Sequence, residues 1–165
     1  AGSRCYDLVC ITDLIATTAE ITGYEFKDED AVDSFSFISS LAGEIGTRKD
    51  VIHHSISGLF SIREKQWKLA CCPGSGGWGS PRDGAALKKN GVDSPLNYQL
   101  YDMSKDQAEK NNLAEKHPEI VQRLRKKLDA QIAAGRTTKG KAQTNDADIK
   151  VDKWKKGSKK PKKEK

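Results

Sequence analysis

The segment that most constrains the fold runs from residue 53 to residue 69, because it has the pattern of a β-hairpin. Phe60 and Ile62 share one parity, so both side chains should fall on the same face of a first strand. The polar residues 63–66 predict a turn, and apolar residues alternate again from Trp67 in a return strand. Two strands joined by so short a turn pair antiparallel, so the sequence predicts an antiparallel sheet.

Other segments extend this sheet and supply a helix to cover it. Residues 51–54 and 97–101 predict two further short strands. Pro118 suits the first position of a C-terminal helix, and Gly135 suits its end. The apolar positions that recur at helical spacing are Ile120, Val121, Leu124, Leu128 and Ile132. We therefore predict an α+β fold, in which a small antiparallel sheet of three to four strands packs against the C-terminal helix.

The N-terminal region predicts another helix, over residues 8–21. Thr12 is a candidate N-cap for it, and Gly23 can end it. Its apolar face would consist of Leu14, Ile15, Thr18 and Ile21.

The positive charge of the chain is concentrated at its C-terminus. The 165 residues carry a formal net charge of +6, yet residues 150–165 alone contain nine lysines and only two carboxylates. The rest of the chain is therefore close to neutral. Low apolar content and repeated lysines predict a disordered basic tail over residues 137–165. Such a tail can bind polyanions loosely through counterion release, or can be a solubilising end without a partner.

Two sequence motifs resemble a known family. The hairpin reads FSIREKQWKL over residues 60–69, and residues 100–119 read LYDMSKDQAEKNNLAEKHPE. Motifs of this kind, in this order, resemble the C-terminal end of type I sulfatases, the formylglycine-dependent hydrolases of sulfate esters. The resemblance runs from about residue 7 to residue 136. It implies that residues 1–24 are the end of the catalytic-core region, with a short strand over residues 6–11, and that residues 25–136 form the C-terminal subdomain.

The catalytic signature of that family is missing from this chain. Type I sulfatases convert a cysteine in a Cys-x-Pro-x-Arg or Cys-x-Ala-x-Arg motif to formylglycine, and they bind calcium through aspartates of their N-terminal half. The nearest match here, residues 71–75, ends in Ser75 where an arginine is required. We therefore predict no catalytic and no metal-binding residue, and no cofactor in this chain. Calcium and formylglycine are implied only for the complete enzyme.

Three residues are candidates for substrate binding. His53 and His54 are neighbours in a strand, so their side chains should face opposite ways. Either one histidine packs in the core and the other is exposed, or one of them lines a substrate pocket. The resemblance implies that this subdomain reaches the rim of the sulfate pocket, where a histidine can donate a hydrogen bond. Trp78, on a glycine-rich loop, can stack on a sugar ring or pack onto the subdomain itself.

The resemblance implies a complete enzyme that hydrolyses a sulfate ester to an alcohol and sulfate. Its substrate would be a sulfated small molecule or polysaccharide, and its location periplasmic or extracellular. The chain alone would be inactive, with the missing N-terminal catalytic domain as its partner. The alternative is a stand-alone polyanion-binding module derived from a sulfatase fold. We expect no membrane partner, since no stretch approaches the roughly 20 apolar residues of a membrane helix.

Overall fold

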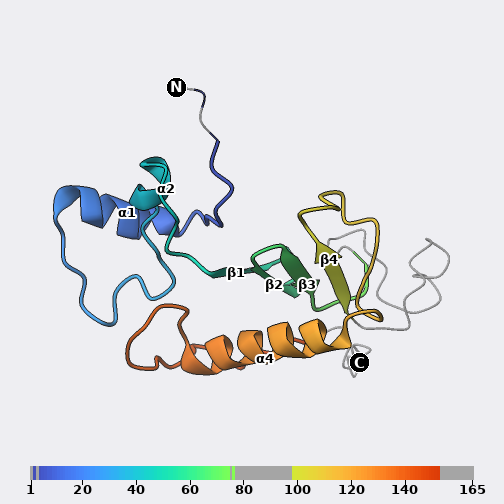
Figure 1. The fold of residues 1–165 in the computed structure, drawn as a ribbon. Coiled ribbons are helices and arrows are strands. Elements are labelled where there is room, and N and C mark those ends of the chain that lie inside the picture. The colour runs from blue at the N-terminus through green and yellow to red at the C-terminus, as the bar shows by residue number, and fades with distance from the viewer. Residues whose placement is uncertain (1, 3, 75, 77–97, 153–165) are drawn as a thin grey trace, which may run out of the picture.

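The fold is built on a four-stranded antiparallel sheet whose strand order follows the sequence. The computed structural model describes residues 2, 4–74, 76 and 98–152. The strands are β1 (Asp50–His54), β2 (Phe60–Glu64), β3 (Trp67–Ala70) and β4 (Gln99–Asp102). Figure 1 shows helix α4 (Pro118–Ala134) running along one face of this sheet. The predicted α+β class, with an antiparallel sheet against a C-terminal helix, is confirmed.

The core lies between the sheet and α4. The strand register aligns one residue from each strand in a row across the sheet, and that row consists of Ile52, Ile62, Leu69 and Leu100. Leu124 and Leu128 of α4 pack against this row and are fully buried. Each such side chain contributes roughly 1.5–3 kcal/mol through its burial. The hairpin and the apolar stripe of α4 are therefore the main source of stability.

Both ends of α4 follow from its sequence. Pro118 occupies the first turn, where its missing N–H is not needed. Gly135 ends the helix in the left-handed region at φ 63°. A Cβ atom at Gly135 would also collide with the carbonyl of Gln143, so two constraints require glycine there.

The N-terminal region differs from its prediction at its start. Helix α1 spans Asp13–Thr22, so it begins five residues later than predicted, and Thr12 makes no side-chain cap. Residues 6–11 form no strand, because no other strand of the described chain lies beside them to pair with. The short helix α2 (Ile38–Leu41) follows, and both helices lie beyond the β1 end of the sheet (Figure 1).

A buried ion pair joins this N-terminal region to the sheet. The Nε atom of Arg48 donates to Asp13 at 2.8 Å, and Nη1 donates to the carbonyl of Asp50 at 2.9 Å. Burial by itself would raise the pKa of the Asp13 carboxyl. Hydrogen bonds from Arg48 and from the backbone N–H groups of Cys10 and Phe35 outweigh it and hold that pKa below its usual range.

The first part of the predicted tail is packed against the body. Residues 137–152 contain no helix or strand, yet the N–H groups of Thr137 and Thr138 donate to the carbonyl of Val32. Val151 is 6% exposed and belongs to the main core. Residues 153–165, which hold eight of the nine lysines between residues 150 and 165, lie outside the described residues.

Candidate functional site

The face of the sheet opposite α4 is hollowed and polar. Its central row is His53, Ser61, Ala70 and Gln99, one residue from each strand in register. The hollow has a volume of about 680 Å³, and the loop after β4 contributes Gln107, Ala108 and Glu109 to its wall. This face therefore forms an open cavity, whereas the other face is filled by α4.

Both candidate histidines line this hollow, and both are exposed. His53 shares its face of β1 with the central row. The ring of His54 makes an edge contact with Phe60, at 6.0 Å between centroids, and its Nδ1 donates to the carbonyl of Ser55 at 3.0 Å. Neither histidine is a core residue, so the alternative in which one of them packs in the core does not hold. Trp78 lies outside the described residues.

His53 is poised to act as a neutral ring. Partial desolvation lowers the pKa of its imidazole, and the positive charge of Lys68 lowers it further, against an opposing effect of Glu109. A neutral imidazole has one N–H donor and one acceptor nitrogen. His53 can thus both donate to and accept from a hydroxyl group placed in the hollow.

Lys68 and Glu109 form an ion pair in the wall of the hollow, with 2.6 Å between Nζ and Oε1. Glu109 has a left-handed backbone at φ 54°, which is uncommon for a residue with a side chain. Asp106 holds this turn by accepting from the backbone N–H groups of Lys110 and Asn111. Glu109 is therefore part of this turn and also pairs through its carboxylate with a lysine of β3.

Gln99 and Tyr101 make the floor of the hollow rigid. The hydroxyl of Tyr101 donates to Gln99 at 2.6 Å, and the amide of Gln99 donates to the carbonyl of Cys72 at 2.8 Å. Burial raises the pKa of Tyr101 to about 12, so its hydroxyl stays protonated. Sequence reasoning missed both residues. Gln99 and Tyr101 flank the core residue Leu100 in β4, and this alternation in the sequence could have placed both on the face opposite the core.

Cys71 and Cys72, which follow β3, are both buried, and Cys72 lines the hollow. Burial raises the pKa of Cys71 to about 12, and burial also raises that of Cys72. A thiol that stays protonated is unreactive. In the part of the chain that the structure describes, no group of three or more His, Cys, Asp and Glu side chains could hold a metal ion. The described residues of the hollow therefore offer no metal site.

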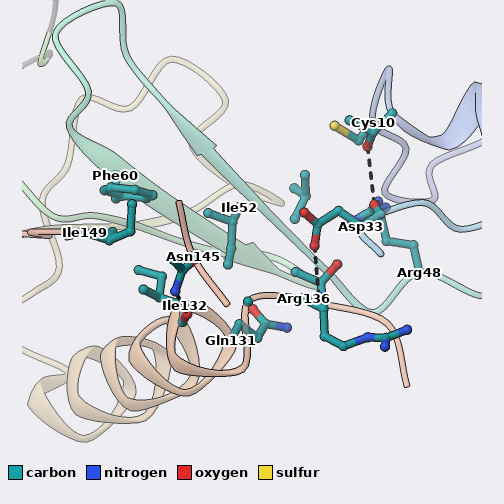
Figure 2. Close-up of a pocket in the computed structure, with 14 residues that line it drawn as sticks. Cys10, Asp33, Arg48, Ile52, Phe60, Gln131, Ile132, Arg136, Asn145 and Ile149 are labelled. Carbon is teal, nitrogen blue, oxygen red and sulfur yellow. Dashed lines mark hydrogen bonds between the residues drawn. The ribbon is translucent and has the colours of Figure 1, made fainter. Parts of the chain in front are cut away.

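A second, smaller pocket of about 260 Å³ lies between the N-terminal region, the sheet and α4. Figure 2 shows apolar side chains such as Ile52 and Ile132 on one side of it and Arg48 and Arg136 on the other. Both arginines already form ion pairs, Arg48 with Asp13 and Arg136 with Asp28. This pocket therefore offers little charge to a ligand, and the hollow beside His53 is the better candidate site.

Comparison with known proteins supports the family relationship. No family model matches the chain. Over 122 residues, or 72% of the chain, it is 28% identical to N-acetylgalactosamine-6-O-sulfatase of Bacteroides thetaiotaomicron. The chain is similar to part of a sulfatase. The predicted resemblance to the C-terminal subdomain of this family is confirmed.

A solved structure gives the same result for the fold. Its description concerns the metabolism of multiple glycosaminoglycans by Bacteroides thetaiotaomicron, and it superimposes with a TM-score of 0.55 at 27% identity over 72% of the chain. The matches span only 22% of the curated relative and 24% of the solved one. The chain thus matches less than a quarter of the length of either relative. None of the described helices is long and apolar enough to cross a membrane.

Proposed function

We propose that this chain serves as the C-terminal subdomain of a sulfuric ester hydrolase, which hydrolyses a sulfate ester to an alcohol and sulfate. Support comes from the similarity to a relative named for a sulfated amino sugar and from the small share of that relative that the chain matches. The chain holds no formylglycine signature. Alone it is catalytically silent, and the catalytic half of the enzyme supplies nucleophile and calcium.

The hollow beside His53 contributes to binding the alcohol portion of the substrate. A sugar presents hydroxyl groups that both donate and accept hydrogen bonds, and a neutral imidazole matches both. The exposure of His53 in a hollow with a hydrogen-bonded floor is the observation that carries this proposal. His54 also lines the hollow, and Trp78 is a further candidate, as a stacking surface for a sugar ring. Lys68 and Glu109 balance each other's charge in the wall, so the hollow suits the uncharged hydroxyl groups of a sugar.

The test is steady-state kinetics of the complete enzyme that contains this chain. With His53→Ala we expect KM to rise about two- to tenfold, the worth of one hydrogen bond. The value of kcat should change little, because the reacting groups lie in the other half. His117→Ala is the control, since His117 is a half-buried histidine that lies outside the hollow, beside Trp67. An unchanged KM for His53→Ala would remove the hollow from the substrate site.

The lysine-rich end supports a second candidate function, loose binding of polyanions. Its nine lysines within residues 150–165 are the observation that favours it. This function is compatible with the first, because a sulfated polysaccharide is itself a polyanion.

A further inference from the structure

The pocket of Figure 2 contains two buried polar atoms that have no hydrogen-bond partner among the described residues. They are the amide oxygen Oε1 of Gln131 and the hydroxyl oxygen of Thr137, and both residues line the pocket. A buried polar atom without a partner costs free energy, and folded proteins contain few of them. Two such atoms in one pocket therefore indicate a polar ligand.

The surroundings of Gln131 decide which kind of group it needs. Its Nε2 donates to the carboxylate of Asp50 at 2.9 Å, and a carboxylate only accepts hydrogen bonds. The amide oxygen of Gln131 is therefore the atom that is left over, and it is an acceptor. Lys127, a nearby cation, is itself paired with Asp50. Gln131 thus requires a donor from the ligand.

Thr137 is fixed at the same pocket by its backbone. Its N–H donates to the carboxylate of Asp33 at 2.9 Å and to the carbonyl of Val32 at 3.2 Å. The side-chain hydroxyl of Thr137 can both donate and accept. A hydroxyl group on the ligand matches both unpaired atoms, because it donates to an amide oxygen and accepts from another hydroxyl.

The rest of the ligand has to be apolar and uncharged. Figure 2 shows Ile52, Phe60 and Ile132 on one side of the pocket. The arginines on the other side, Arg48 and Arg136, are neutralised by their ion pairs, so they do not select an anion. A cavity of about 150 Å³ with apolar walls is large enough for a benzene ring. The volume of about 260 Å³ here is therefore sufficient for a ring that carries a substituent.

We propose that this pocket binds a small neutral ring compound that carries a hydroxyl group, of which a phenol is the simplest. The hydroxyl group forms hydrogen bonds with Gln131 and Thr137, and the ring lies against the apolar side of the pocket. No residue is shared between this pocket and the hollow beside His53. The inference therefore goes beyond the proposed function and does not depend on it.

The experiment measures the protection of Cys10 from alkylation, with p-cresol as the probe. Cys10 lines the pocket and is half-buried, whereas Cys5 is exposed and lies outside it, so Cys5 is a control within the same molecule. Modification of each cysteine by N-ethylmaleimide is followed by mass spectrometry while p-cresol is added to the 165-residue chain. We expect saturating p-cresol to slow the modification of Cys10 several-fold and to leave that of Cys5 unchanged. Toluene, which lacks the hydroxyl group, should bind about two- to tenfold more weakly, the worth of one hydrogen bond.

Substitution of Thr137 tests the contact with the hydroxyl group directly. Thr137→Val retains the shape of the side chain and the backbone hydrogen bonds, so p-cresol should bind about two- to tenfold more weakly while toluene binds as before. Thr137→Ser keeps the hydroxyl and should restore the preference for p-cresol. Thr18→Val is the matched control, because Thr18 is exposed on α1 and lies outside the pocket.

Three outcomes overturn the proposal. Equal affinity for p-cresol and toluene would show that the pocket accepts a ring without using Gln131 and Thr137. Protection of Cys10 by neither compound would mean that water alone pairs with the two atoms. Equal protection of Cys10 and Cys5 would mean that p-cresol binds without a defined site. All three comparisons use the unsubstituted chain, so they decide the question even if a Thr137 variant fails to fold.

Discussion

Asp152 accepts a hydrogen bond of 2.9 Å from Nη1 of Arg125, and the hydroxyl of Tyr98 donates to the same carboxylate oxygen at 3.0 Å. The end of the described chain is thereby attached both to α4 and to the residue before β4. Val151 enters the core immediately beside this contact. The segment after α4 is thus part of the folded body as far as residue 152.

Truncation tests this attachment. A chain that ends at Asp152 should unfold in urea like the complete chain. A chain that ends at Arg136 should lose about 1.5–3 kcal/mol of unfolding free energy, mainly because Val151 no longer fills its place in the core. Equal stability of the two truncated chains would show that the packing of residues 137–152 contributes nothing.

The Asp13–Arg48 pair should dominate the stability of the N-terminal region. Arg48→Ala leaves a buried carboxylate without its partner, at a cost of about 3–5 kcal/mol. Arg123→Ala is the control, because Arg123 pairs with Glu64 at the surface and its loss should cost less than about 1 kcal/mol. Urea denaturation of both variants makes the comparison. Equal losses of unfolding free energy in the two variants would mean that the buried pair stabilises the fold no more than the surface pair does.

The same pair predicts a dependence of stability on pH. The pKa of Asp13 is lower in the folded chain than its ordinary value of about 3.9, so the unfolded state takes up the proton first as the pH falls. The contribution of Asp13 is therefore complete above that ordinary value and is lost as the pH falls through the folded value. Arg48→Ala should flatten this part of the stability profile. An identical acid profile in the variant would contradict the assigned cause.

The environment of His53 can be measured by NMR titration. Its pKa should lie below the ordinary value of about 6.5. Lys68→Met should raise that pKa, because the substitution removes the nearby positive charge and leaves Glu109 unpaired. A fall or no change would show that Lys68 does not act on the ring.

The basic end should account for retention on heparin. Removing residues 153–165 deletes eight of the nine lysines between residues 150 and 165, so retention at modest salt should be lost. Retention of the shortened chain at full strength would reveal a basic patch on the body.

The isolated chain should release no sulfate from an aryl sulfate, with or without calcium. It lacks the cysteine signature from which formylglycine is made. Calcium-dependent turnover by material free of host sulfatase would contradict its place as a partial enzyme.

The sequence predicted those parts of the fold whose partners lie within this chain. The alternating apolar residues around Ile62 pack against the apolar stripe around Leu124, so the hairpin and the C-terminal helix both form where the sequence predicts them. The face of α1 that carries Leu14 is exposed among the residues that the structure describes, and this exposure became visible only in three dimensions. For the site, His53 was identified from the sequence, whereas the Lys68–Glu109 pair joins residues 41 positions apart that no local pattern connects.

The sequential order of the four strands also bears on how the polypeptide is made. Each strand pairs with the one synthesised just before it, so the sheet can assemble as the chain leaves the ribosome. Its cover arrives last, since α4 begins only at Pro118. Until then Ile62, Leu69 and Leu100 face water together. A nascent chain that stalls between β4 and α4 should therefore bind chaperones through this exposed apolar face of the sheet.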